Sequence, residues 1–148
     1  MTTRIPERGA LIDSAKVFLD TTVLIYAALG SVDEPKKHAR ALELLVEDFG
    51  TSGQVLAEFY YNATCKGAPP LEPAVAREWV NNLAKKPFQP IDVATIRAGT
   101  HHAQHFQISY WDGAIIAAAE RLGATTVYSE DLPPGQHYGS VEVVNPFQ

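Results

Sequence analysis

The sequence predicts an α/β sandwich in which helices flank a mostly parallel central sheet. Short, almost wholly apolar runs at 17–19, 125–128 and 141–144 have the pattern of strands buried on both faces. Segments with helical periodicity alternate with these runs, as in chains that build parallel sheets. Hydrophobic residues make up 46% of the 148 residues and charged residues 20%, which is typical of a globular domain.

The totals limit the class of protein. We expect one domain over 16–148, preceded by a loosely ordered leader over 1–15. The net charge of −5 argues against a protein that coats nucleic acid by charge alone. Cys65 is the single cysteine, so an internal disulfide is excluded and a reducing compartment fits. No apolar stretch approaches a membrane span or a signal-peptide core, and we expect a soluble cytoplasmic protein without a membrane partner.

The first strand ends on a carboxylate, Asp20. In open α/β sheets, ligands bind beyond the carboxyl ends of the strands, so this acid is a candidate site residue. The spacing predicts a helix directly afterwards, capped by Thr21 or Thr22 and closed by Gly30. The alternative is that Asp20 is itself the helix cap.

Two helices are predicted next, over 35–49 and 53–64. The second is apolar or aromatic except for Gln54, Glu58 and Asn62, which are spaced by four and form one narrow polar stripe. A helix that is apolar nearly all round is buried, and a buried carboxylate needs a partner or a metal. The alternative is that the stripe faces water.

The next part of the chain predicts a helix from Pro73, a short strand over 88–93 and a helix over 94–107. On this last helix His101 and His105 are four residues apart and share a face, so they could share a metal. No third ligand is indicated nearby, which favours a solvated face.

Two more acids follow. Ser109 and Asp112 have the Ser-x-x-acid spacing of a capping box at the start of a helix, and Asp112 falls on its buried face. It caps the helix or faces a site at the end of the sheet. The strand over 125–128 runs into Ser129, Glu130 and Asp131, and of the two adjacent acids we predict that Asp131 points inward.

If Asp20, Glu58, Asp112 and Asp131 converge, they form a strongly negative pocket. Like charges ~4 Å apart repel by ~4 kcal/mol at an effective dielectric constant near 20, so such a cluster requires cations. Mg²⁺ and Mn²⁺ prefer oxygen ligands, and they can orient a water and stabilise a leaving phosphodiester oxygen. No zinc-type Cys/His spacing and no glycine-rich phosphate loop is present in the sequence.

With these residues in view, the sequence resembles PIN-domain ribonucleases, and in particular VapC-type toxins of bacterial toxin–antitoxin pairs. The resemblance extends from Lys16 to Phe147. It rests on four motifs, each of which contains one of the four acids: FLDTTVLIYA (18–27), QVLAEFY (54–60), SYWDGAIIAAA (109–119) and TVYSEDL (126–132), the last together with the closing VVNPF (143–147).

The resemblance implies a PIN-like α/β/α sandwich and Mg²⁺-dependent RNA cleavage, with Mn²⁺ as a possible substitute. It also implies a cognate antitoxin that blocks the acidic site, and a homodimer. Gly113 stands where alanine is common in the family, which should loosen that helix slightly. The metal-holding and catalytic residues would be Asp20, Glu58, Asp112 and Asp131, with Thr22 and Ser129 in support.

Three alternatives remain. The first is a PIN-fold nuclease that processes RNA without any antitoxin. The second is a phosphoryl-transfer or receiver-like domain that uses Asp20, although a haloacid-dehalogenase-type site would have an aspartate where Thr22 stands. The third is a non-catalytic binding module, which four clustered acids argue against because they would be destabilising without a use.

Overall fold

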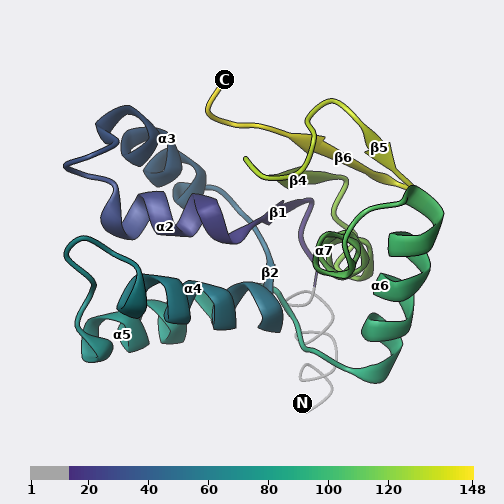
Figure 1. Ribbon diagram of the computed structural model, residues 1–148, viewed down its shortest axis with the longest axis horizontal. Helices are drawn as coiled ribbons and strands as arrows, with labels where there is room; N and C mark the ends of the chain where they lie inside the picture. The colour runs from purple at the N-terminus through teal and green to yellow at the C-terminus, as the bar shows by residue number, and fades with distance from the viewer. Residues whose placement is uncertain (1–13) are drawn as a thin grey trace, which may run out of the picture.

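The computed structural model describes residues 14–148, and its central sheet is mostly parallel, as predicted. Four strands lie in the order β1-β4-β6-β5 (Figure 1). Their pairing is parallel except between β5 and β6. The strands are β1 (Val17–Leu19), β4 (Thr126–Tyr128), β5 (His137–Tyr138) and β6 (Val141–Val144).

A second, two-stranded parallel sheet pairs β2 (Thr51–Ser52) with β3 (Phe88–Gln89). A parallel bridge between Phe18 and Gly50 joins β1 to the chain just before β2. The strands therefore follow one another as β3-β2-β1-β4-β6-β5. The sequence did not predict β2 and β5, because two residues are too few to show an alternating pattern.

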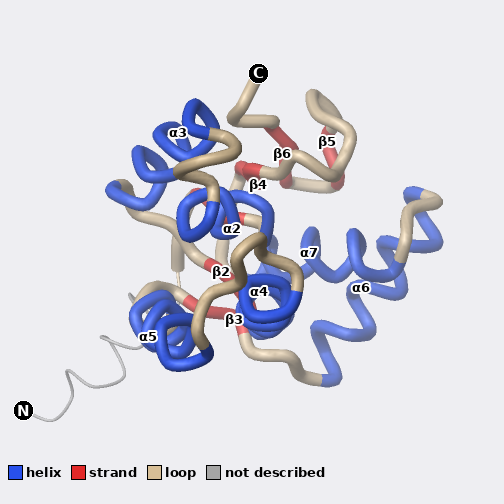
Figure 2. Tube along the Cα trace, turned by 60° about the vertical axis from the view of Figure 1, so that its left-hand side comes forward, coloured by secondary structure: helices blue, strands red, loops and turns tan. Residues whose placement is uncertain are grey.

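Helices lie on both sides of this sheet. In Figure 1, α2 to α5 lie on one side of β1 and α6 and α7 on the other, and the tube of Figure 2 shows the same division. The helices are α2 (Thr21–Leu29), α3 (Pro35–Val46), α4 (Gly53–Cys65), α5 (Pro73–Leu83), α6 (Val93–Phe106) and α7 (Tyr110–Arg121). No helix within residues 14–148 has the length and apolar character needed to cross a membrane.

Two predicted boundaries were wrong. The helix expected over 35–49 ends at Val46, and the chain then turns back towards the sheet. The strand expected over 88–93 ends at Gln89, because Asp92 caps α6 by accepting a hydrogen bond from Thr95 N at 2.8 Å. The predicted leader over 1–15 lies outside the described residues except for its last two.

The core lies where the sheet meets α2, α4 and α7. Its fully buried side chains include Phe18 of β1, Phe59 of α4 and Ile116 of α7. The helix α4 is less buried than predicted, because Tyr60 and Tyr61 are exposed on its outer face. The buried contacts fix α4 and α7 against the carboxyl ends of β1 and β4.

Helices α6 and α7 approach each other at two glycines. A Cβ on Gly113 would lie 2.5 Å from the carbonyl oxygen of Gly99, which is closer than real Cβ atoms come to backbone. Gly113 therefore has a packing role in addition to the slight loosening of its helix that the sequence predicts. This glycine permits backbone contact between α7 and α6, and that contact helps to set the position of the start of α7.

Candidate functional site

A cavity of about 440 Å³ lies beyond the carboxyl ends of β1 and β4, against α4 and the start of α7. All four predicted acids line it. Asp20 follows β1, Asp131 follows β4, Glu58 lies in the middle of α4, and Asp112 lies in the first turn of α7. The fold thus brings together four carboxylates that are spread over more than a hundred residues of sequence.

The polar stripe of α4 faces this cavity. Gln54, Glu58 and Asn62 all belong to its lining, and Glu58 is half-buried. The Oε1 of Glu58 accepts a hydrogen bond from the Thr21 hydroxyl at 3.2 Å. Of the two interpretations of the stripe, the one in which it faces the site agrees with the structure.

Asp20 is the most deeply placed of the four acids, with 6% of its surface exposed. One oxygen, Oδ1, accepts a hydrogen bond from Thr21 N at 2.7 Å, and this bond makes Asp20 the N-cap of α2. The other, Oδ2, accepts one from the Ser129 hydroxyl at 2.7 Å. The predicted cap at Thr21 or Thr22 was wrong, and Asp20 caps the helix while it also lines the cavity.

Burial is the main influence on the Asp20 carboxyl. It raises the pKa from 3.8 to about 6, against the lowering effect of the bonds from Ser129 and Thr21. Repulsion from Asp131 and Glu58 adds smaller increases to this pKa. The sequence argument attributed the cost of the cluster to like-charge repulsion, but at Asp20 the loss of water weighs more.

Ser129 connects the ends of β1 and β4. Its side chain is fully buried, and its hydroxyl donates to Asp20 while accepting from Asp131 N at 3.1 Å and Leu132 N at 3.3 Å. A hydroxyl suits this place because it can donate once and accept twice. Ser129 therefore fixes the backbone that carries one cavity acid against the side chain of another.

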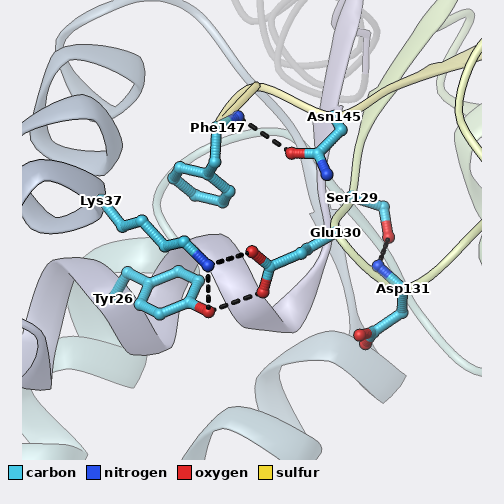
Figure 3. A network of polar contacts seen from close by, with 7 residues as sticks. All are labelled: Tyr26, Lys37, Ser129, Glu130, Asp131, Asn145 and Phe147. Carbon is cyan, nitrogen blue, oxygen red and sulfur yellow. Dashed lines mark hydrogen bonds and ion pairs between the residues drawn. The ribbon is translucent and has the colours of Figure 1, made fainter. Parts of the chain in front are cut away.

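The adjacent acids Glu130 and Asp131 point in different directions (Figure 3). The carboxylate of Glu130 meets Lys37 and Tyr26 and does not line the cavity, whereas Asp131 does. Burial would raise the pKa of Glu130, but the hydrogen bonds from Lys37 and Tyr26 outweigh it and hold this pKa below its usual value. Burial, with repulsion from Glu130 and Asp112, raises the pKa of Asp131.

Thr22 also lines the cavity. Its Oγ1 is buried and has no hydrogen-bond partner within residues 14–148. A buried hydroxyl without a partner costs free energy, and this one has almost no surface open to the cavity that the residue lines.

The four carboxylates share a lining but do not form a preassembled metal site. Among residues 14–148, no group of three or more His, Cys, Asp or Glu side chains is arranged to hold a metal ion. The chemistry of the lining nevertheless suits hard cations, because its four acids offer carboxylate oxygens as ligands. The rings of His101 and His105 stack at 5.9 Å between centroids on an exposed face, in agreement with the solvated-face interpretation.

The sequence analysis gave no site role to several residues of the lining, among them Trp111 and Lys66. Trp111 is 61% exposed beside Asp112, and its carbonyl accepts a hydrogen bond from Gln54 Nε2 at 3.3 Å. Lys66 is the one basic side chain among the described residues that line the cavity. A tryptophan inside the capping-box motif is a signal that could have been noticed, but nothing near Lys66 in the sequence indicates its position.

Solved structures with this fold include bacterial toxins and their complexes. The Mycobacterium tuberculosis toxin VapC20, described as cleaving the Sarcin-Ricin loop, is 18% identical with a TM-score of 0.58, covering 85% of this chain and 98% of that one. FitAcB from Neisseria gonorrhoeae is 23% identical with a TM-score of 0.59, covering 88% and 98%. DNA-bound VapBC from Salmonella typhimurium is 16% identical with a TM-score of 0.60, covering 86% and 96%. At these identities the likeness concerns the fold.

A comparison of sequences gives the family. No curated protein matches the chain. A family model described as the PIN domain matches residues 17–132, which run from the first strand to the residue after Asp131. Since this match covers well over half of the sequence and includes all four cavity acids, the chain belongs to the PIN domain family.

Proposed function

We propose that this protein is a metal-dependent endoribonuclease that cleaves RNA phosphodiester bonds in the carboxylate cavity, and that it acts as the toxin of a VapC-type toxin–antitoxin pair. The observation that carries the proposal is that Asp20, Glu58, Asp112 and Asp131 line one cavity although four separate elements supply them. The family supports a nuclease, and the toxins among the solved structures of this fold support the biological role.

The four cavity acids would hold Mg²⁺, or Mn²⁺ in its place. Their carboxylate oxygens are the ligands that these ions prefer. A bound divalent ion supplies positive charge that orients and activates a water and stabilises the oxygen that leaves the phosphodiester.

The protein's own part is to hold the acids in place. Two hydrogen bonds orient the Asp20 carboxylate, one from Thr21 N and one from Ser129, and Thr21 also donates to Glu58. These bonds reach the acids from elements fixed by the buried core. Because active-site groups must be held within a fraction of an ångström, such supporting contacts belong to the proposed mechanism.

The proposed partners are an antitoxin and a second copy of the chain. VapBC and FitAB, the complexes found among the similar structures, pair a protein of this fold with a partner. A net charge of −5 and an acidic cavity would complement a basic inhibitory segment. A small reading frame next to the gene would favour the antitoxin over an RNA-processing nuclease that acts alone, and light scattering would give the oligomeric state.

The test is cleavage of total bacterial RNA by the purified protein, with Mg²⁺ or Mn²⁺, with chelator, and with the Asp20→Asn variant. We expect discrete fragments that require both metal and Asp20. Loss of this acid should lower the rate by more than about a hundredfold, since even residues behind metal ligands contribute 10–100-fold. Intact RNA in the presence of protein shown to bind Mn²⁺ would refute the nuclease proposal.

A further inference from the structure

Glu130 is held by two side chains that come from different helices. The Tyr26 hydroxyl of α2 donates to Oε1 at 2.6 Å, and Lys37 Nζ of α3 donates to Oε2 at 2.5 Å (Figure 3). Lys37 also donates to the Tyr26 hydroxyl at 3.3 Å, so the three groups form a closed triangle. We call Tyr26, Lys37 and Glu130 the anchor triad.

The anchor triad is more protected than an ordinary surface ion pair. The side chains of Lys37 and Glu130 are 31% and 25% exposed. Lys37 Nζ lies 5.0 Å from the centroid of the Tyr26 ring, and the Phe147 ring packs edge-on against Tyr26 at 5.0 Å. Partial burial and the hydrogen bond from Tyr26 should make this pair stronger than exposed pairs, which contribute little.

The position of the triad matters because Glu130 precedes a cavity acid. Asp131 is repelled by Glu130 and by Asp112 across the cavity, so repulsion alone would not draw it into the site. The two residues lie in a bend after β4, and Figure 3 shows their carboxylates pointing apart, with Glu130 towards Lys37 and Asp131 away from it. Because the residues are adjacent, holding the Glu130 side chain on one side of this bend restricts the direction that is left to Asp131. Within residues 14–148, Glu130 has a cationic partner and Asp131 has none.

We propose that the anchor triad selects Asp131, and not Glu130, as the fourth acid of the cavity. Lys37 would then be a positioning residue for a cavity that it does not line, and Tyr26, which does line the cavity, would position Glu130 through its hydroxyl. The inference rests on the proposed function only in so far as the cavity binds a divalent ion. It links α3, which supplies no cavity acid, to the acid after β4.

The first experiment measures Mn²⁺ affinity by calorimetry on folded variants, without RNA. Lys37→Met removes the charge but keeps the length of the side chain, and it should weaken Mn²⁺ binding by about 10–100-fold, as removal of groups behind metal ligands does. Lys37→Arg keeps the cation and should retain affinity within a few-fold. Glu43→Gln breaks an exposed ion pair with Arg40 on the same helix and should change nothing.

The second experiment is a double-mutant cycle that separates positioning from general destabilisation. In the wild type, Asp131→Asn should reduce Mn²⁺ affinity strongly. In the Lys37→Met background Glu130 is released and can take the place of Asp131, so the same Asp131→Asn change should cost several-fold less. In the kinetics of RNA cleavage, Lys37→Met should lower kcat more than it raises KM for RNA, since neither Lys37 nor Glu130 lines the cavity, although Tyr26 does.

The outcomes distinguish this inference from the proposed function. Wild-type protein that binds no Mn²⁺ would refute the metal site itself. Normal Mn²⁺ affinity in folded Lys37→Met protein, or strictly additive effects of Lys37→Met and Asp131→Asn, would refute only the selection of Asp131 by the anchor triad.

Discussion

The carboxylates that follow β1 and β4 lie in two different environments, one on the cavity side and one on the side of Lys37. On the cavity side Asp20 and Asp131 form no ion pair within residues 14–148, and burial raises the pKa of each. On the other side Glu130 meets Lys37, and its pKa is lowered. The difference shows that the residue type does not mark a functional acid. What separates the two groups among the described residues is a cationic partner, which Glu130 has and the cavity acids Asp20 and Asp131 lack.

The largest expected effect is a gain in stability when the buried charge of Asp20 is removed. The folded-state pKa of about 6 lies above 3.8, so the folded protein binds this proton more tightly than the unfolded chain does. The contribution of Asp20 to the free energy of unfolding is therefore fully present below about pH 4 and is lost as the pH rises through 6. The loss is about 3 kcal/mol for two pK units.

Asp20→Asn should escape this loss and should keep the helix cap, since Asn caps about as well as Asp. Urea unfolding in chelator should show the variant more stable than the wild type at pH 8 and similar to it near pH 4. A variant less stable than the wild type at pH 8 would mean that burial of the Asp20 charge costs less than its hydrogen bonds contribute.

A divalent ion should make the wild type gain more stability than the Asp20→Asn variant. Mn²⁺ at about a hundred times its dissociation constant should stabilise the wild type by about 2.7 kcal/mol, because it binds only the folded state. The Asp20→Asn variant should gain much less at the same concentration. Melting curves with and without Mn²⁺ measure both gains, and equal gains in the two proteins would place the ion outside the cavity.

Loss of the Ser129 hydroxyl should have the next largest effect. Ser129→Ala leaves the buried amides of Asp131 and Leu132 and one oxygen of Asp20 without a partner, and should lower the free energy of unfolding by about 1–3 kcal/mol. The pKa of Asp20 should rise further, since the bond from Ser129 lowers it. Carboxyl NMR titration reports that pKa. Ser140→Ala, on the exposed surface, is the control.

The smallest effect is expected at the exposed pair between Arg40 and Glu43. The Glu43 side chain is 66% exposed, and pairs of this kind contribute little in water. Glu43→Gln should therefore change the free energy of unfolding by no more than about 0.5 kcal/mol in urea denaturation. A larger loss than Glu130→Gln causes would contradict the distinction between exposed and half-buried pairs.

Local sequence pattern was enough to predict much of the site. Apolar runs that end on acids placed Asp20 and Asp131 at strand ends, and helical spacing placed Glu58 on a polar stripe. The partners of these acids could not be predicted, because Ser129 is 109 residues from Asp20 and Lys37 is 93 residues from Glu130. Strands β2 and β5 were not predicted either, because each has only two residues, which is too few to show a period.

The close contact at Gly113 limits which residues can stand at this position in a protein of the same fold. A relative with alanine at this position cannot seat α7 on α6 as this chain does, because its Cβ would meet the Gly99 carbonyl. Asp112 directly precedes Gly113, so a shift of α7 carries that carboxylate with it. Two proteins of this fold can therefore differ in the place of one cavity acid through a single methyl group on the far side of the helix backbone.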